Sequence, residues 1–158
     1  MKKTFFIITL VCSFFISPLQ AFAQEQAPTI SAETAILIDA KTGEILYEKD
    51  SRKRMYPASI TKLMTILLAL EHANLTDKIT FSHDAVYSIE AGSAHIAIQE
   101  GEILTLEQCL YGIILRSANE VSNAIAEHVD GSIETFAQHM TNRAKDLGCT
   151  DTNFVNAN

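Results

Sequence analysis

The chain has 158 residues, of which 12 are basic and 19 acidic, so its formal net charge is −7. This acidic surplus argues against nucleic acid as a partner, because nucleic-acid-binding domains carry basic patches. The length suffices for one hydrophobic core but not for two domains of ordinary size.

The first 23 residues have the pattern of a secretory signal peptide. Lys2 and Lys3 precede an apolar run over residues 5–16, and small residues occupy positions 21 and 23. We expect cleavage before Gln24 and an exported, extracytoplasmic protein. The alternative is an uncleaved anchor, but the run is shorter than the roughly 20 apolar residues of a spanning helix. Cleavage removes two lysines and no acidic residue, which changes the net charge from −7 to −9.

The predicted elements after the leader begin with a β-hairpin. Residues 35–38 and 44–47 are β-prone, and residues 39–43 between them contain the Asp and Gly of a tight turn. Residues 59–73 are predicted to be a helix because apolar side chains recur at helical spacing. The stripe expected to be buried consists of Ile60, Leu63, Met64, Leu67 and Leu68.

Three more helices are predicted after an ambiguous stretch at residues 74–101, which contains turn signals at 92–93 and 100–101. Thr105 and Gln108 form a capping box for a helix through residue 115, and Gly131 and Gly148 end helices over 120–130 and 133–147. The side chains expected to face inward are Leu106, Leu110, Ile113, Ile114, Val121, Ala124, Ile125, His128, Phe136, Met140 and Leu147.

Two cysteines remain after removal of the leader, which contains Cys12. The apolar surroundings of Cys109 favour a buried, inert thiol, although an exported protein permits a disulfide between Cys109 and Cys149. Neither cysteine has metal-ligand spacing, and no two histidines form an His-x-x-x-His pair.

Ser59 and Lys62 stand three residues apart at the start of a predicted helix, where they share one face. A serine becomes a useful nucleophile when a base takes its proton, and desolvation and the helix dipole can lower a lysine pKa enough for that role. Backbone N–H groups at the helix start can stabilise an oxyanion. The alternative is an N-cap serine followed by a surface lysine. A first-turn cation, however, opposes the dipole by about 0.3–1 kcal/mol.

Ser117-Ala118-Asn119 separates two predicted helices. The serine can relay a proton to Lys62 or to a leaving amine, and the asparagine amide can orient a substrate carbonyl. The alternative is an ordinary N-cap for the helix over 120–130, and the motif by itself favours that interpretation.

Taken together, Pro57-Ala58-Ser59-Ile60-Thr61-Lys62 and Ser117-Ala118-Asn119 resemble the motifs of the penicillin-binding serine enzymes. More narrowly, they resemble the low-molecular-mass D-alanyl-D-alanine carboxypeptidases. Residues 39–47, 110–120 and 136–148 are similar to that family's opening hairpin, second-motif helix and following helix, so the resemblance covers nearly all of the chain after residue 23.

The resemblance implies an α/β (α+β) fold of the penicillin-binding and serine β-lactamase type, with helices flanking an antiparallel sheet. It implies removal of the terminal D-alanine of peptidoglycan stem peptides through an acyl-enzyme on Ser59, with Lys62 as base, Ser117 as proton relay and Asn119 as substrate-orienting residue. It implies that the reaction uses no metal or cofactor. It also implies that β-lactams act as acylating inhibitors. Ala118 and Glu120 replace the family's usual glycine and aspartate.

The family's third motif, Lys-Thr-Gly or Lys-Ser-Gly, is expected on a later strand, so residues 24–158 are interpreted as the N-terminal portion of the catalytic domain. Only the opening hairpin and the helical region are expected within it. Lys41-Thr42-Gly43 has the motif's letters but falls in the predicted hairpin turn, and we interpret it as a turn. Family members often attach to the membrane through a C-terminal amphipathic helix.

Three alternatives share part of this evidence. A serine β-lactamase would share both motifs, but no Glu-x-x-Leu-Asn element of the class A enzymes follows Asn119. A second alternative is a non-catalytic remnant that binds wall peptide. A third is a serine–histidine site, which the scattered histidines do not favour; these are His72, His83, His95, His128 and His139.

Overall fold

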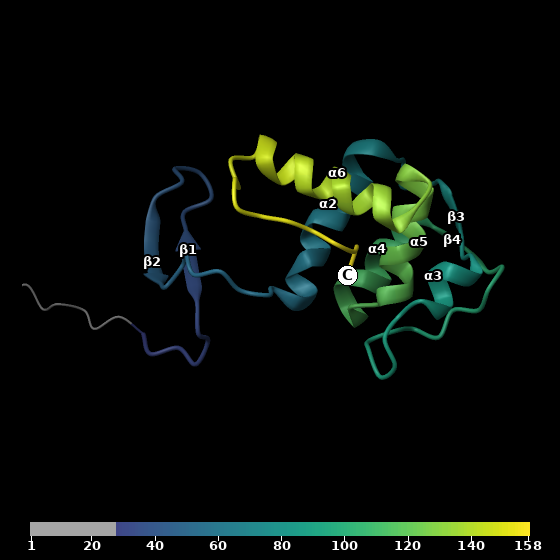
Figure 1. Cartoon of the computed structure of the whole chain (residues 1–158), viewed down its shortest axis with the longest axis horizontal. Helices are drawn as coiled ribbons and strands as arrows, with labels where there is room; N and C mark the ends of the chain where they lie inside the picture. Colours follow the sequence, from purple (N-terminus) through teal and green to yellow (C-terminus); the bar gives the residue numbers. More distant parts are fainter. Residues whose placement is uncertain (1–27) are drawn as a thin grey trace, which may run out of the picture. The chain divides into compact units, whose positions relative to one another are not determined.

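The computed structural model describes residues 28–158, so the predicted leader at residues 1–23 lies outside the described range. The chain divides into two compact units with a boundary between Arg54 and Met55 (Figure 1). None of the described helices is long and apolar enough to cross a membrane.

The first unit contains the predicted hairpin. Strands β1 (Ala35–Ile38) and β2 (Ile45–Lys49) are antiparallel. In the turn, Asp39 Oδ1 accepts hydrogen bonds from the main-chain N–H groups of Thr42 at 2.8 Å and Lys41 at 2.9 Å. These bonds lower the pKa of Asp39. Gly43 completes the turn with a φ of 74°, a conformation that glycine adopts without a Cβ clash.

The second unit contains the predicted helices. A 3₁₀ turn, η1 (Ala58–Thr61), leads into α2 (Lys62–His72), so the helix predicted from Ser59 begins as a 3₁₀ turn. Helices α4 (Leu106–Arg116), α5 (Asn119–Asp130) and α6 (Ile133–Asp146) agree with the prediction within two residues at each end. The capping box of Thr105 and Gln108 is present, and Gly131 ends α5 in a left-handed conformation.

The ambiguous stretch at residues 74–101 and the residues directly after it contain three short elements. Strands β3 (Lys78–Thr80) and β4 (Ile103–Thr105) pair antiparallel, with Ile79 opposite Leu104. Helix α3 (His83–Tyr87) is capped by Ser82, whose hydroxyl accepts from Ala85 N. The region after the hairpin is mainly helical, as predicted, but it also contains a short antiparallel strand pair that the sequence did not indicate. Elements of three to five residues leave no periodic pattern to detect.

Helix α5 lies at the centre of the second unit, where it contacts α2, α3, α4, α6 and β3 (Figure 1). One apolar cluster joins α5 to α4, α3 and the β3–β4 pair, and a second joins it to α2 and α6. The segment after α6 returns beside α2, where Thr65 Oγ1 donates to the buried carbonyl oxygen of Ala157 at 2.6 Å.

Several predicted inward faces were partly wrong. Ile60 and Leu63 are 66% and 67% exposed, whereas Lys62 and Thr65 are buried with Leu68. The buried face of α2 therefore includes the polar side chains of Lys62 and Thr65, and both of these are hydrogen-bonded. Three further residues that were predicted to face inward are exposed, and these are Ile114, His128 and Leu147.

Candidate active site

Ser59 lies in η1, immediately before α2. Pro57 is the N-cap of η1 and Thr61 that of α2, and neither makes a side-chain cap bond, so Ser59 does not have the capping role that the sequence left open. Ala58 has a φ of 49°, in the left-handed region that costs a non-glycine residue roughly 1–2 kcal/mol. Such strained residues are concentrated at functional sites. Ser59 itself is exposed, so its hydroxyl is accessible to a ligand.

Lys62 is the first residue of α2 and is only 4% exposed. Its Nζ donates a hydrogen bond to Ser59 Oγ at 3.3 Å. Desolvation lowers the pKa of Lys62 below its ordinary value, because burial disfavours the charged ammonium. Both expectations from the Ser-x-x-Lys spacing are therefore met: the two side chains are in contact, and the lysine is shifted toward its neutral form.

Ser117 lies between α4 and α5. It is the C-cap of α4 with a left-handed φ of 54°, while the N-cap of α5 is Ala118. The Ser117 hydroxyl donates to Ser59 Oγ at 2.8 Å, across 58 positions of sequence. The N-cap alternative for this motif is therefore wrong. The side chain is used in a contact with Ser59 instead.

Asn119 begins α5 and is half-buried. Its main-chain N–H donates to Ala94 O at 2.9 Å, which fixes the start of the helix. Asn119 lines a cavity of about 520 Å³ together with Ser59 and Lys62. The other lining residues are Ala58, Ser88, Ile89, Glu90, Asn123, Ile133, Glu134, Asn156 and Asn158.

All four residues predicted for the site are thus close together. Ser59, Lys62 and Ser117 are linked by hydrogen bonds, and Asn119 shares the cavity with Ser59. Sequence reasoning missed Asn123, which follows Asn119 by one helical turn and lies on the same side of α5. That spacing was visible, but nothing in it indicated that an asparagine in mid-helix would be buried.

The other candidate groups of the sequence lie elsewhere. Cys109 and Cys149 are both free thiols, and burial raises the pKa of Cys109 to about 12, as expected for an inert thiol. Among the described residues, the hydrogen bonds to Ser59 Oγ come from Lys62 and Ser117 and from no histidine. No cluster of three or more metal-binding side chains occurs within residues 28–158.

Known proteins are similar to this chain in sequence. Residues 21–158 match the model of the peptidase S11 family, described as D-alanyl-D-alanine carboxypeptidase. The chain belongs to this family. The carboxypeptidase DacF of Bacillus subtilis is 38% identical over 146 residues, covering 86% of this chain and 37% of DacF. DacC of Escherichia coli is 34% identical over 152 residues, covering 89% of this chain and 38% of DacC.

The fold agrees as well. Penicillin binding protein 5 from Haemophilus influenzae superposes with a TM-score of 0.73 and 28% identity, covering 82% of this chain and 39% of that structure. The predicted fold class, of the penicillin-binding type, is therefore confirmed. The chain spans about 37% of the length of DacF.

Proposed function

We propose that this protein is a serine-type D-alanyl-D-alanine carboxypeptidase that shortens peptidoglycan stem peptides through an acyl-enzyme on Ser59. Its membership of the S11 family supports this class of reaction. The observation that carries the proposal is the contact of Ser59 Oγ with both Lys62 Nζ, at 3.3 Å, and Ser117 Oγ, at 2.8 Å.

Acylation begins with neutral Lys62. Its Nζ accepts the Ser59 proton along the existing contact while Ser59 Oγ forms a bond to the carbonyl carbon of the penultimate D-alanine. The carbonyl electron pair moves to oxygen and gives a tetrahedral intermediate. The low exposure of Lys62 favours this step, because a desolvated amine is neutral over a wider pH range.

The intermediate then breaks the bond to the terminal D-alanine. The leaving nitrogen takes a proton from the Ser117 hydroxyl, which recovers one from the Lys62 ammonium. This returns Lys62 to its neutral form. In deacylation, Lys62 takes a proton from water as the water oxygen attacks the ester, and that proton returns to Ser59 Oγ. The net change is one water consumed and one D-alanine released.

Asn119 is proposed to orient the substrate. An amide offers donors for a peptide carbonyl and an acceptor for a peptide N–H, and Asn119 lies in the same cavity as the nucleophile. A β-lactam presents an acyl group that Ser59 can attack in the same way. Penicillins are therefore proposed as acylating inhibitors.

The domain and location of the protein are also proposals. Residues 24–158 would be the N-terminal portion of the catalytic domain, in line with the partial coverage of DacF and DacC. Residues 1–23 would be a cleaved leader, because their charge and apolar pattern fits export. The mass of the protein recovered from a secreting host tests the leader, with cleavage before Gln24 expected.

The test of function measures D-alanine release from a diacetyl-Lys-D-Ala-D-Ala peptide by the protein expressed from its complete reading frame. We expect release by the unaltered protein, none by Ser59→Ala, and unchanged release by the matched control Ser51→Ala in the first unit. Release by Ser59→Ala would contradict the role of Ser59. Rapid penicillin hydrolysis without D-alanine release would indicate a β-lactamase instead, and inactivity toward both would indicate a non-catalytic protein.

A further inference from the structure

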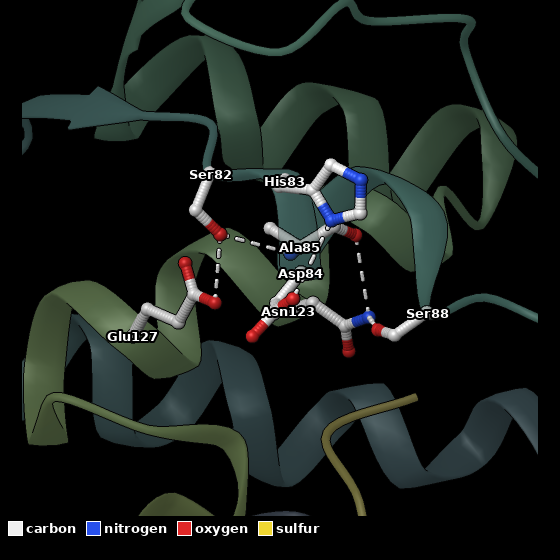
Figure 2. A network of polar contacts seen from close by, with 7 residues as sticks. All are labelled: Ser82, His83, Asp84, Ala85, Ser88, Asn123 and Glu127. Atoms are coloured by element: carbon white, nitrogen blue, oxygen red, sulfur yellow. Dashed lines mark hydrogen bonds and ion pairs between the residues drawn. The ribbon is translucent and has the colours of Figure 1, made fainter.

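Asn123 is an unusual residue for the middle of α5. It is 3% exposed, and a buried amide is costly unless its donors and acceptor are paired. Here they are paired in full. Asn123 Nδ2 donates to Ser88 Oγ at 3.2 Å and to Ala85 O at 3.4 Å, and Oδ1 accepts from Asn158 Nδ2 at 2.9 Å. Figure 2 shows the Asn123 side chain pointing toward Ala85 and Ser88.

These partners come from separate segments of the second unit. Ser88 is the C-cap of α3, and Asn158 belongs to the segment that returns beside α2 after α6. Ser88, Asn123 and Asn158 all line the cavity that contains Ser59 and Lys62. One buried amide therefore joins three segments into a single wall of that cavity.

Asn123 is separated from the reacting groups themselves. The hydrogen bonds that Lys62 and Ser117 donate to Ser59 do not involve it. Since almost none of its surface is exposed, Asn123 has little area with which to touch a ligand, whereas its partner Ser88 is exposed. We therefore expect the effect of Asn123 on the reaction to pass mainly through its hydrogen-bonded partners Ser88 and Asn158, which also line the cavity.

We propose that Asn123 is a positioning residue that fixes the cavity wall against which the acyl part of the peptide binds. The proposal rests on the proposed carboxypeptidase function. Removal of the amide releases Ser88 and Asn158, so the wall no longer has one fixed shape. The chemical step at Ser59 keeps its own hydrogen bonds. Binding of the peptide should therefore weaken while the turnover of bound peptide is retained.

The chain supplies a matched control for this proposal. A second polar contact also joins α3 to α5, because Ser82 Oγ donates to Glu127 Oε1 at 2.8 Å, one helical turn from Asn123 (Figure 2). Neither Ser82 nor Glu127 lines the cavity. Glu127→Ala breaks this contact but leaves the Ser82 cap of α3 in place, so it loosens the same pair of helices without touching the wall.

The experiment measures KM and kcat for D-alanine release by four variants of the protein expressed from its complete reading frame. We expect Asn123→Ala to raise KM by about fivefold or more, the effect of losing one or two hydrogen bonds, with kcat within about twofold. Asn123→Asp keeps the shape but loses both donors, so its KM should rise as well. Ser88→Ala should raise KM by a smaller factor, and Glu127→Ala should leave KM unchanged.

Three results would overturn the proposal. The first is an unchanged KM for Asn123→Ala, and the second is a fall in kcat of that variant at constant KM. The third is a rise in KM for Glu127→Ala as large as that for Asn123→Ala, which would reveal a general loosening of the two helices. If Asn123→Ala does not fold, Ser88→Ala decides, because it removes only one exposed hydroxyl. No D-alanine release by the unaltered protein would contradict the proposed function as well. Normal release with unchanged KM values would contradict the positioning role alone.

Discussion

Two short segments of this protein place a lysine beside a hydroxyl residue, and they differ in what surrounds them. In the hairpin turn, Lys41 is exposed, and Thr42 Oγ1 donates to Asp39 Oδ1 at 3.0 Å. At the start of α2, Lys62 is 4% exposed and donates to Ser59 Oγ, which also accepts from Ser117.

The difference shows that burial and a second hydroxyl distinguish the candidate site from the turn. The polar groups of the hairpin turn are used to close the chain reversal, with Asp39 Oδ1 accepting three hydrogen bonds from Lys41 and Thr42. The side chains around Ser59 make no capping hydrogen bonds. They converge on one oxygen, and one of them has a lowered pKa.

The largest expected effect comes from replacing the buried lysine. Lys62→Arg should lower the rate of acylation by a fluorescent penicillin by about 10²–10⁴, because a guanidinium does not release its proton at usable pH. The matched change Lys41→Arg in the hairpin turn should leave the rate unchanged. Acylation of Lys62→Arg within a few-fold of normal would remove Lys62 from the mechanism.

Ser117→Ala should have the next largest effect. The variant loses the proton relay to the leaving amine, so kcat for D-alanine release should fall by about 10² or more. Acylation by penicillin should suffer less, because a strained lactam needs less help to open. Thr42→Ala provides the comparison in the hairpin turn and should release D-alanine at the normal rate. Equal rates for both variants would contradict the relay.

The pH dependence of acylation should reflect the environment of Lys62. Below the pKa of the lysine, the neutral fraction rises about tenfold per pH unit, and the acylation rate should rise with it. Because the pKa is lowered, the rate should level off below pH 10.5, the ordinary value for lysine. Stopped-flow acylation across pH measures this profile. A rate that still rises through pH 10.5 would mean that Lys62 is not desolvated.

The smallest expected effect is on stability alone. Gly43→Ala places a Cβ on a residue with a φ of 74°, although no atom lies within 4 Å of that Cβ. The cost is conformational, about 1–2 kcal/mol, and should appear as a lower free energy of unfolding in urea. Acylation of the folded variant should be normal. A large loss of acylation would assign the hairpin turn a role that its contacts do not indicate.

Much of the second unit was predictable because its helices carry local signals. The capping box of Thr105 and Gln108, and the glycine at 131, lie within a few residues of the ends they mark. The site residues were predictable for a different reason. Ser59 and Lys62 are three residues apart, a spacing that predicts the contact between their side chains, and the Ser117 hydroxyl donates a second hydrogen bond to Ser59 Oγ.

The features that the sequence did not predict depend on contacts between segments that are distant along the chain. The β3–β4 pair joins residues more than twenty positions apart, and neither strand is long enough to show alternation. Ile114 is exposed although it is apolar, and Lys62 is buried although lysine side chains usually lie at the surface. Asn123 was not predicted to be buried, because its partner Ser88 is 35 positions away and Asn158 is equally distant.

The central claim is that Ser59 becomes the acylated residue. The most direct measurement is proteolysis of the penicillin-treated protein, expressed from its complete reading frame, followed by mass spectrometry of its peptides. We expect one penicilloyl adduct, on Ser59, and no adduct in the Ser59→Ala variant. An adduct on Ser117 or on any other residue, or a protein that penicillin does not modify, would contradict the account.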